Sequence, residues 1–320
     1  MTGFLYPADY IARHGVSGPP WEAAEAQAYT RWLTRAHYEN FPVVSLLLPR
    51  RLHQDFYNVY SFCRWADDLG DEIGDPRRSL ELLAWWRREL DRMYAGEARH
   101  PVYVALSDTV RRHSLPPKPF EDLIHAFVQD QTDTRYATYD ALLGYCAYSA
   151  NPVGRLVLLL CGYRDAEHAR LSDFTCTALQ LANFWQDVRR DWEKGRVYIP
   201  LEAMEDAGYS VGALERDIQS GKASPALQIV LRGLVDRCEA LFEKGLPLVE
   251  MVDRRLAVDL DLFSRGGMAI LEKIRRQQFD VIAQRPKHSK WDRARLLAGA
   301  LVRQSLRFSR VDREARHAYR

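Results

Sequence analysis

Several common signatures are missing from this 320-residue sequence. Its five cysteines are odd in number and widely scattered, and no Cys-x-x-Cys pair occurs, so neither a disulfide framework nor a zinc site is predicted. No stretch of about 18 apolar residues is present, so we expect no transmembrane helix. The segment 1–20 contains Asp9 and Arg13 and no long apolar run, so no secretory signal is expected.

Nucleotide-binding signatures are missing as well. No Gly-x-Gly-x-x-Gly follows a predicted strand, and neither a P-loop nor a His-Glu-x-x-His helix is present. We therefore expect no NADPH site, no nucleoside triphosphate site and no zinc-protease centre. The net charge of +2 favours no class of partner, and without a recognition motif we expect no nucleic acid to bind.

Alternating apolar and polar residues, which are typical of β-strands, are also missing, whereas apolar residues recur at helical spacing. Because 47% of the residues are hydrophobic, the chain can bury a large core, and we predict a single-domain, all-α protein. Its expected parts are an irregular lead-in (1–20), a helical catalytic domain (21–284) and a basic helix and tail (285–320) that packs on the same domain. The expected helices are 21–37, 50–71, 78–94, 102–113, 120–130, 139–150, 153–161, 165–192, 225–246, 248–265, 268–283 and 289–307.

The main functional signal in the sequence is one polar helix face. Gln180, Asn183, Asp187 and Asp191 follow each other at steps of three, four and four residues, so their side chains share one face. Carboxylate and amide oxygens are ligands of hard cations, and Mg²⁺ in particular is bound by one or two carboxylates plus substrate phosphate oxygens. A solvated polar stripe would show the same spacing, so this pattern alone leaves both interpretations open.

A second acidic face lies earlier in the chain, where Tyr60, Arg64, Asp67 and Asp71 follow helical spacing and Asp68 adjoins them. Like charges one turn apart destabilise a helix, and acidic side chains near its C-terminus oppose the macrodipole. A ligand must therefore compensate for them. Two such acidic helices facing each other predict a site in which Mg²⁺ bridges the carboxylates to a diphosphate.

Together these motifs resemble those of the squalene/phytoene synthase family of prenyl-diphosphate enzymes. The resemblance covers roughly residues 25–290, and both aspartate motifs are intact and in order. The matched positions are Tyr60, Arg64, Asp67, Asp68 and Asp71; Gln180, Asn183, Asp187 and Asp191; Arg196, Tyr198 and Pro200; and the segments 37–41, 144–145, 151–154 and 266–271. The resemblance implies an isoprenoid-synthase-like helical bundle around a central cavity.

The resemblance also implies roles for individual residues. The metal ligands would be Asp67, Asp71, Asn183, Asp187 and Asp191, holding more than one Mg²⁺. The catalytic set would add Tyr60, Arg64 and Gln186. The substrate would be bound by Phe41, Tyr145, Ala150, Gln180, Asn183, Phe184, Arg196 and Tyr198.

The residues within these motifs are similar to those of the hydroxysqualene synthase branch of this family, which serves bacterial hopanoid synthesis. That branch takes presqualene diphosphate, removes the diphosphate and captures the carbocation with water. Many family members carry Arg directly before the Asp that opens the second aspartate pair, whereas this chain has Gln186. A neutral amide can hydrogen-bond a water molecule. We therefore hypothesise that Gln186 is linked to the formation of an alcohol product.

Two other functions remain open at this point. One is head-to-head prenyl condensation on the same fold, giving presqualene diphosphate, squalene or phytoene. The other is a non-catalytic helical assembly factor, which degraded aspartate motifs would have indicated. Pathway enzymes that exchange substrate with the chain are expected partners.

The C-terminal segment 285–320 differs from the rest in charge, since two Lys and nine Arg against two Asp and one Glu give it a net charge of +8. It is either a basic amphipathic helix lying on anionic lipid or a closing helix with a frayed basic tail. We accordingly expect a cytoplasmic protein, with a peripheral position at the inner membrane face under the first alternative.

Overall fold

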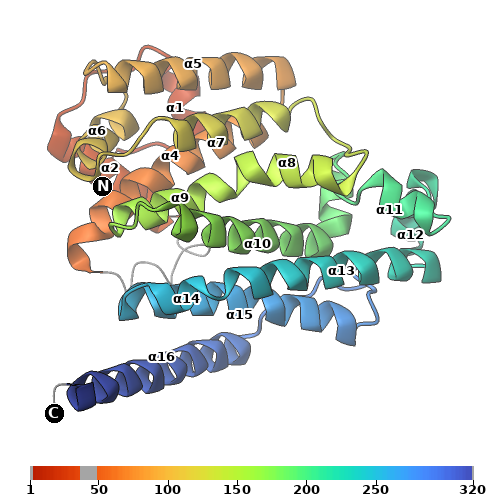
Figure 1. The fold of residues 1–320 in the computed structure, drawn as a ribbon. Helices are drawn as coiled ribbons and strands as arrows, with labels where there is room; N and C mark the ends of the chain where they lie inside the picture. Colours follow the sequence, from red (N-terminus) through yellow and green to blue (C-terminus); the bar gives the residue numbers. More distant parts are fainter. Residues whose placement is uncertain (1–2, 37–48, 319–320) are drawn as a thin grey trace. The chain divides into compact units, whose positions relative to one another are not determined.

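The structure is a computed structural model, which describes residues 3–36 and 49–318, with side chains up to residue 308 in the last helix. Over these ranges the chain forms helices and loops without a β-strand (Figure 1), which confirms the all-α prediction. The helices are α1 (Pro7–His14), α2 (Ala23–Ala36), the short 3₁₀ helix η2 (Arg50–Leu52), α4 (His53–Asp71), α5 (Pro76–Tyr94), α6 (Pro101–His113), α7 (Lys118–Gln129), α8 (Tyr139–Ser149), α9 (Asn151–Leu160), α10 (Ala166–Glu193), α11 (Leu201–Asp206), α12 (Val211–Ser220), α13 (Pro225–Gly245), α14 (Leu248–Met251), α15 (Arg254–Arg276) and α16 (Lys290–Ala318).

The chain folds into two compact units. The first comprises Met1–Asp133 and Ala147–Asp165, and the second comprises Thr134–Cys146 and Ala166–Arg320. The first acidic helix, α4, belongs to the first unit, and the second, α10, belongs to the second. The domain boundaries expected from the sequence stay a prediction.

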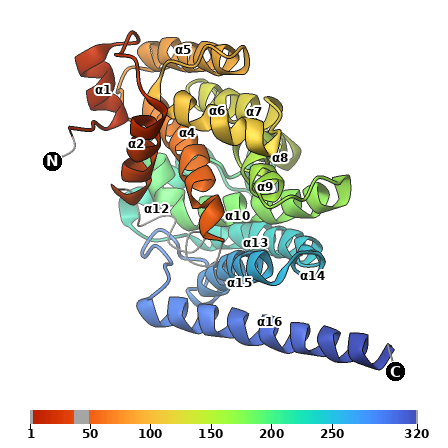
Figure 2. The ribbon, with the colours of Figure 1, turned by 90° about the vertical axis from the view of Figure 1, so that its left-hand side faces the viewer.

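Helix α4 is the centre of the first unit, where it packs against α2, α5, α6, α7 and α9. Figure 2 shows α4 with α2 on one side and α7 on the other. On its buried side Trp65 stacks on Trp86 of α5, with ring centroids 5.2 Å apart. Phe62 meets Phe120 of α7 edge to face at 5.0 Å. Burying such large side chains contributes roughly 2–3 kcal/mol each, so this aromatic core fixes which face of α4 points inward.

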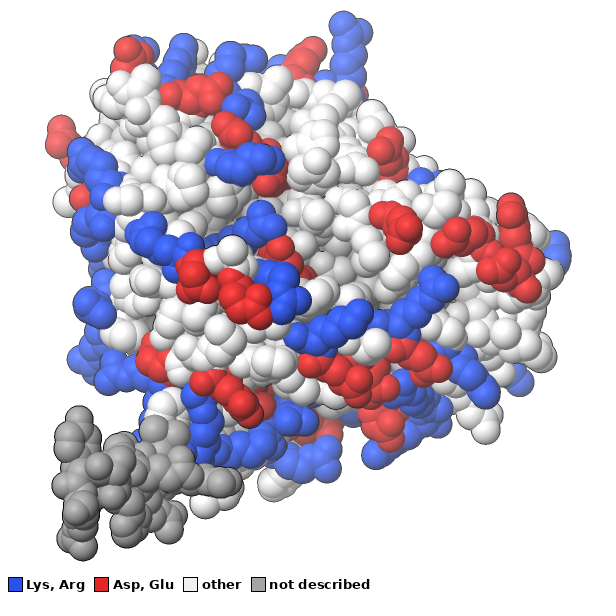
Figure 3. All heavy atoms as spheres, in the orientation of Figure 1, with Lys and Arg blue, Asp and Glu red and all other residues white. Residues whose placement is uncertain are grey.

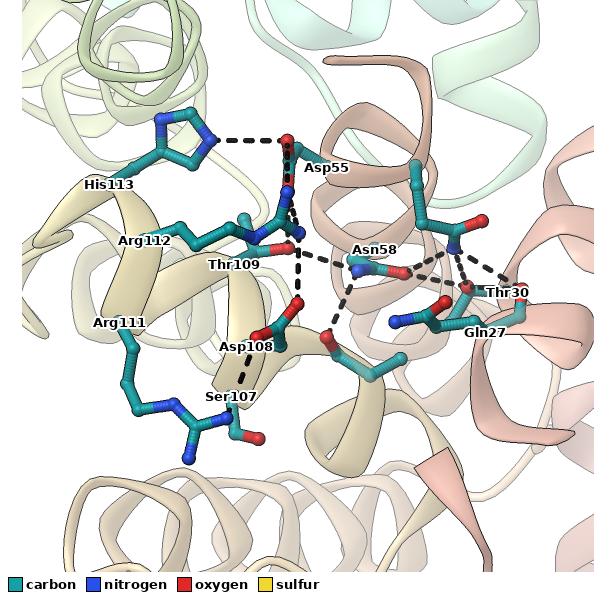
Figure 4. Close-up of polar contacts among 12 residues, drawn as sticks. Gln27, Thr30, Asp55, Asn58, Ser107, Asp108, Thr109, Arg111, Arg112 and His113 are labelled. Carbon is teal, nitrogen blue, oxygen red and sulfur yellow. Dashed lines mark hydrogen bonds and ion pairs between the residues drawn. The ribbon is translucent and has the colours of Figure 1, made fainter. Parts of the chain in front are cut away.

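Polar contacts anchor the start of α4 to the end of α6 (Figure 4). The fully buried carboxylate of Asp55 accepts hydrogen bonds from Thr109 Oγ1 at 2.8 Å and Arg112 Nη2 at 2.7 Å, and it contacts His113 Nε2 at 3.1 Å. One turn later, Asn58 Nδ2 donates to Thr109 Oγ1 at 3.0 Å. These contacts fix the rotation and register of α4, and hence the direction of its acidic face.

In the second unit, α10 packs against α13, α14 and α15, and α15 packs against α13, α14 and α16. A helix break expected at Gly266–Gly267 is wrong, because α15 runs unbroken through both glycines. At Gly267 the ring of Phe242 occupies the space where a side chain would lie, with its Cζ 2.1 Å from the position of a Cβ. The glycine therefore allows α13 to approach α15. Helix α15 begins at Arg254, and the carboxylate of the preceding residue, Asp253, caps the amides of Arg255 and Leu256.

The irregular lead-in expected over 1–20 is also corrected, since it contains α1. Pro7 opens this helix, where its missing N–H costs nothing. Tyr10 is buried and meets Trp65 edge to face at 5.3 Å. Burial of one aromatic residue thus orders a segment too short to be stable as an isolated helix.

Most of the other predicted helices agree with the structure to within a few residues, but α16 continues eleven residues beyond the predicted end at 307, and α11 and α12 lie where no helix was predicted. The second acidic helix, for example, was expected over 165–192 and spans Ala166–Glu193. Over the described ranges no helix has both the length and the apolar character needed to cross a bilayer. Basic and acidic side chains lie side by side over most of the face drawn in Figure 3, as suits a chain with 45 basic and 43 acidic residues.

Candidate active site

The first aspartate motif lies on the last three turns of α4, on the face opposite its aromatic core. Tyr60, Arg64 and Asp67 are partly exposed there, and Asp71 is exposed at the last residue of the helix. Gly70 is flanked by Gln131, whose Nε2 would lie 3.2 Å from a Cβ at this position. The helix thus ends with its acidic side chains accessible and its backbone held close to the segment that follows α7.

Arg64 organises the carboxylates of this motif. Its guanidinium contacts Asp67 at 3.3 Å and also pairs with Asp68, whose side chain is 6% exposed whereas that of Asp67 is 45% exposed. Burial raises the pKa of Asp68 to about 6 although Arg64 opposes the shift. Asp68 is therefore an internal partner of Arg64, and Asp67 is the carboxylate that remains accessible to a ligand.

The second motif lies on about the last four turns of α10, where its four side chains share one face as the spacing predicted. Asn183 is exposed, and Gln180, Asp187 and Asp191 are partly exposed, while Phe184 and Val188 beside them are buried. The backbone amide of Arg196 donates to the carbonyl oxygen of Asp191 at 2.8 Å. The chain therefore turns back at the end of α10 and brings Arg196 close to the last carboxylate of the motif.

The structure adds an arginine to this motif that sequence reasoning missed. Arg285, which lies between α15 and α16, makes a two-pronged contact with Asp187: Nε to Oδ1 at 2.5 Å and Nη2 to Oδ2 at 2.7 Å. Arg190 lies farther from the same carboxylate, at 3.7 Å. Such a fork-to-carboxylate pair is among the stronger ionic contacts. Arg285 thus occupies both oxygens of a proposed metal ligand.

Gln186 is buried, and its Nε2 donates to the backbone carbonyl of Pro286. Together with the Arg285 pair, this bond fastens the segment 285–286 to two consecutive residues of α10. The amide nitrogen of Gln186 is therefore engaged inside the second unit. If this residue orients a water, its side-chain carbonyl oxygen is the group that would do so.

Four aromatic rings gather beside the second motif. Phe184 and Tyr198 stack face to face at 3.8 Å and 9°. Tyr145 lies 6.2 Å from Phe184 and 5.9 Å from Tyr198. Tyr136 lies 5.4 Å from Tyr145 and 5.9 Å from Tyr198. Three of these rings were predicted site residues, so the second unit brings them together as expected.

Tyr136 was missed because its position depends on a backbone contact between distant segments. The amide of Val197 donates to the carbonyl of Thr134 at 2.9 Å, and the amide of Leu201 donates to the carbonyl of Tyr136 at 3.0 Å. These bonds align 134–137 with 197–202 and carry the Tyr136 ring onto Tyr198. The only local signal was an aromatic residue closing a polar loop, which by itself predicts nothing about its partner.

The remaining predicted residues divide between the units. Tyr60 and the buried Ala150 belong to the first unit, whereas Gln180 belongs to the second. Phe41, together with the matched segment 37–41, lies outside the described residues.

The donor chemistry of both motifs fits Mg²⁺. Each offers carboxylates at positions i and i+4 of a helix, Asp67 with Asp71 and Asp187 with Asp191, and the second adds the amide oxygen of Asn183. No three His, Cys, Asp or Glu side chains in the described part of the chain are gathered as a ready-made metal site. Ions held here would therefore take further ligands from water or a phosphate, as Mg²⁺ commonly does.

Comparison with known proteins points to one family. Residues 34–292 match the squalene/phytoene synthase family. The hydroxysqualene synthase of Rhodopseudomonas palustris is 36% identical over 250 residues, 77% of this chain and 82% of that protein. The phytoene synthase of Thermus thermophilus is 30% identical over 269 residues, 84% and 90% of the two chains.

A solved structure is also similar to most of the chain. The squalene synthase HpnC of Alicyclobacillus acidocaldarius is 46% identical, with a TM-score of 0.75 over 82% of this chain and 98% of that chain. The family match, residues 34–292, includes both aspartate motifs, and these relatives each cover more than three quarters of the sequence. The chain belongs to the squalene/phytoene synthase family, as its motifs predicted.

Proposed function

We propose that the protein is a hydroxysqualene synthase, which ionises presqualene diphosphate and captures the carbocation with water. The observation that carries this proposal is the 36% identity, over 77% of the chain, to a relative that bears this name. Three such relatives, 32–36% identical, support it. An enzyme that joins two prenyl diphosphates head to head would have to supply the substrate and is the expected pathway partner.

The acidic and basic side chains would act on the diphosphate. Mg²⁺ held by Asp67 and Asp71 on α4, and Mg²⁺ held by Asn183, Asp187 and Asp191 on α10, would each neutralise negative charge of the diphosphate. Arg64, already aligned by Asp67 and Asp68, and Arg196, at the end of α10, would hydrogen-bond the leaving group as charge develops on it. Oriented guanidinium groups of this kind lower such barriers by roughly several kcal/mol.

The aromatic rings would act on the carbocation that remains. The ring faces of Tyr145, Phe184 and Tyr198 carry negative charge, and each stabilises a nearby cation by roughly 0.5–2 kcal/mol. Tyr136 extends this cluster. Phe184 and Tyr198 cover one face of each other, so each would offer its other face to the cation.

Water capture completes the reaction. The oxygen of one water forms a bond to the carbocation carbon, and its extra proton passes to the released diphosphate or to solvent. We propose that the buried, neutral Gln186 suits this step better than an arginine would, because a guanidinium there would bind phosphate and exclude the water.

The test is a substrate comparison on the purified protein with Mg²⁺ and without NADPH. One reaction contains presqualene diphosphate and the other farnesyl diphosphate, and both are analysed by mass spectrometry. We expect an alcohol and free diphosphate from presqualene diphosphate and no product from farnesyl diphosphate. Formation of presqualene diphosphate from farnesyl diphosphate would instead assign the condensing reaction, which the phytoene synthase relative performs by name.

A further inference from the structure

One face of α16 exposes large apolar side chains. We call Trp291, Leu297, Leu301, Val302 and Leu306 the Trp291 face; their exposed fractions are 86%, 38%, 42%, 58% and 65%. Half of the ten large, exposed apolar side chains of the described residues therefore lie on this helix. At 100° per residue all five fall on one half of the helix surface, and Trp291 and Val302 are nearly in line.

The other half of α16 is fixed to its own unit. Arg303 makes paired contacts to Asp261 of α15 at 2.8 and 2.9 Å. Arg307 donates to the carbonyl of Val249 at 2.6 Å, and Gln304 is buried. In both Figure 1 and Figure 2, α16 is the outermost helix of its unit. The helix is thus held through its polar side, and its apolar side is turned away from the core.

Basic side chains flank Trp291 at the N-terminal end of the Trp291 face. Lys290, Arg293 and Arg295 are exposed, with the Arg295 side chain 80% exposed. By helical geometry, Lys290 and Arg295 project on opposite sides of Trp291, within the half of the helix surface that carries the apolar side chains, whereas Arg293 projects outside that half. The nearby carboxylate of Asp292 is engaged by Lys273 at 2.8 Å and contacts Arg295 only at 4.0 Å, so it offsets the charge of these flanking cations only in part.

We propose that the Trp291 face lies in the interfacial layer of an anionic lipid bilayer, with the helix parallel to the membrane plane. An apolar face with an interfacial tryptophan, and with Lys and Arg whose long stems let the charged groups reach the head groups, suits a helix that rests on a membrane. The apolar side chains enter the acyl boundary while the flanking cations meet phosphate head groups. Each such cation contributes favourably near an anionic surface. The helix rests on the bilayer, since only one of its sides is apolar.

Charge favours lipid over a second copy of the chain as the occupant of this face. Two copies joined in parallel through their Trp291 faces would bring Lys290, Arg293 and Arg295 of each close to the same residues of the other. An antiparallel pairing would bring these cations toward the C-terminal half of the partner helix, whose sequence is also net basic. Like charges held together in this way oppose association. The proposal goes beyond the proposed function and does not depend on which prenyl diphosphate the protein uses.

The test is flotation of the full-length protein with vesicles at low salt. Phosphatidylglycerol vesicles supply the anionic surface, and phosphatidylcholine vesicles supply the neutral one. We expect binding to the first, weakened by added salt, and about tenfold weaker binding for the double variant Val302→Gln, Leu306→Gln. The matched control is Ile229→Gln on α13, which removes an apolar side chain that is 62% exposed on another helix and should change nothing.

Two further measurements make the result decisive. Addition of anionic vesicles should shift tryptophan emission to shorter wavelength, and most of that shift should be lost in Trp291→Phe. Light scattering after gel filtration should give the same mass for the double variant and the unchanged chain. Three results would overturn the proposal. The unchanged chain does not bind anionic vesicles, or the double variant and the control lose vesicle binding to the same extent. The third is a dimer formed by the unchanged chain and by the control but not by the double variant.

Discussion

Asp259 is a buried acidic residue that affects how the stability of the protein depends on pH. It lies on α15, it is 1% exposed, and neither carboxyl oxygen has a hydrogen-bond partner within the described residues. Asp261, two residues on, projects from the opposite side of the helix and pairs with Arg303 and Arg265. Burial raises the pKa of Asp259 to about 8, and the charge of Asp253 adds to this shift. At neutral pH the folded protein therefore holds this carboxyl mostly protonated.

This raised pKa predicts how stability depends on pH. Between the ordinary pKa of 3.8 and the folded value of about 8, the folded state binds a proton that the unfolded state has lost. The free energy of unfolding therefore falls as pH rises through this window, by about 1.4 kcal/mol per unit of pKa difference. We expect Asp259→Asn to stabilise the protein, and to do so more at pH about 8 than at pH about 5.

Urea unfolding followed by circular dichroism at the two pH values measures this effect. Asp261→Asn is the matched control on the same helix, and it should destabilise the protein because it breaks the pair with Arg303. Equal stability changes for Asp259→Asn at both pH values would show that the Asp259 carboxyl does not titrate between them.

At the scale of single elements, the orientation of α4 depends on the buried carboxylate of Asp55. We expect Asp55→Ala to lower the free energy of unfolding by about 3 kcal/mol or more, because Thr109, Arg112 and His113 would lose their common partner. The control is Asp108→Ala, which removes a 3.1 Å contact to the same Arg112 from a side chain that is 41% exposed. That change should cost less than about 1 kcal/mol. Comparable losses in the two variants would refute the anchoring role of Asp55.

The segment that follows α15 bears on metal binding, because Arg285 covers both oxygens of Asp187. Removing this competing cation should raise the affinity for Mg²⁺ in the absence of substrate, so we expect Arg285→Gln to bind Mg²⁺ a few-fold more tightly in calorimetry. Arg190→Gln removes an equal charge that lies 3.7 Å away, and serves as the control. Unchanged or weaker Mg²⁺ binding by Arg285→Gln alone would contradict this competition.

The elements differ in how far the sequence predicted them. The acidic faces of α4 and α10 were predictable because their signal is local, with residues one turn apart on the same helix. Arg285 lies 98 residues from Asp187, and the placement of Tyr136 depends on a backbone contact with Val197. Nothing in the local pattern encodes either. The prediction of a helix break at the glycines of α15 was wrong for a related reason. Local propensity predicts a break there, whereas Gly267 allows the close approach of Phe242.

At the scale of the whole molecule, family membership and helical architecture were predictable from two intact motifs in the right order. The two compact units each carry one of them. What the sequence could not predict is the state of each carboxylate, because burial and ion pairing depend on tertiary packing. Asp67 is accessible beside the covered Asp68, and Asp187 is held by Arg285.

The difference in exposure between Asp67 and Asp68 predicts that their substitution reduces activity to different extents. We expect Asp67→Asn to reduce turnover by at least about a hundredfold while the helical circular dichroism persists, because it removes an accessible ligand. Asp68→Asn should retain more activity, since this residue acts on the substrate only through Arg64. Steady-state kinetics on presqualene diphosphate compare the two, and a larger loss in Asp68→Asn would reverse the assignment.

The most direct measurement is the origin of the oxygen in the product. The purified protein is incubated with presqualene diphosphate and Mg²⁺ in water enriched in ¹⁸O, and the product is analysed by mass spectrometry. Capture of the carbocation by water predicts hydroxysqualene that carries the label at its hydroxyl group. Unlabelled alcohol, or a hydrocarbon in its place, would contradict the proposed hydroxysqualene synthase reaction.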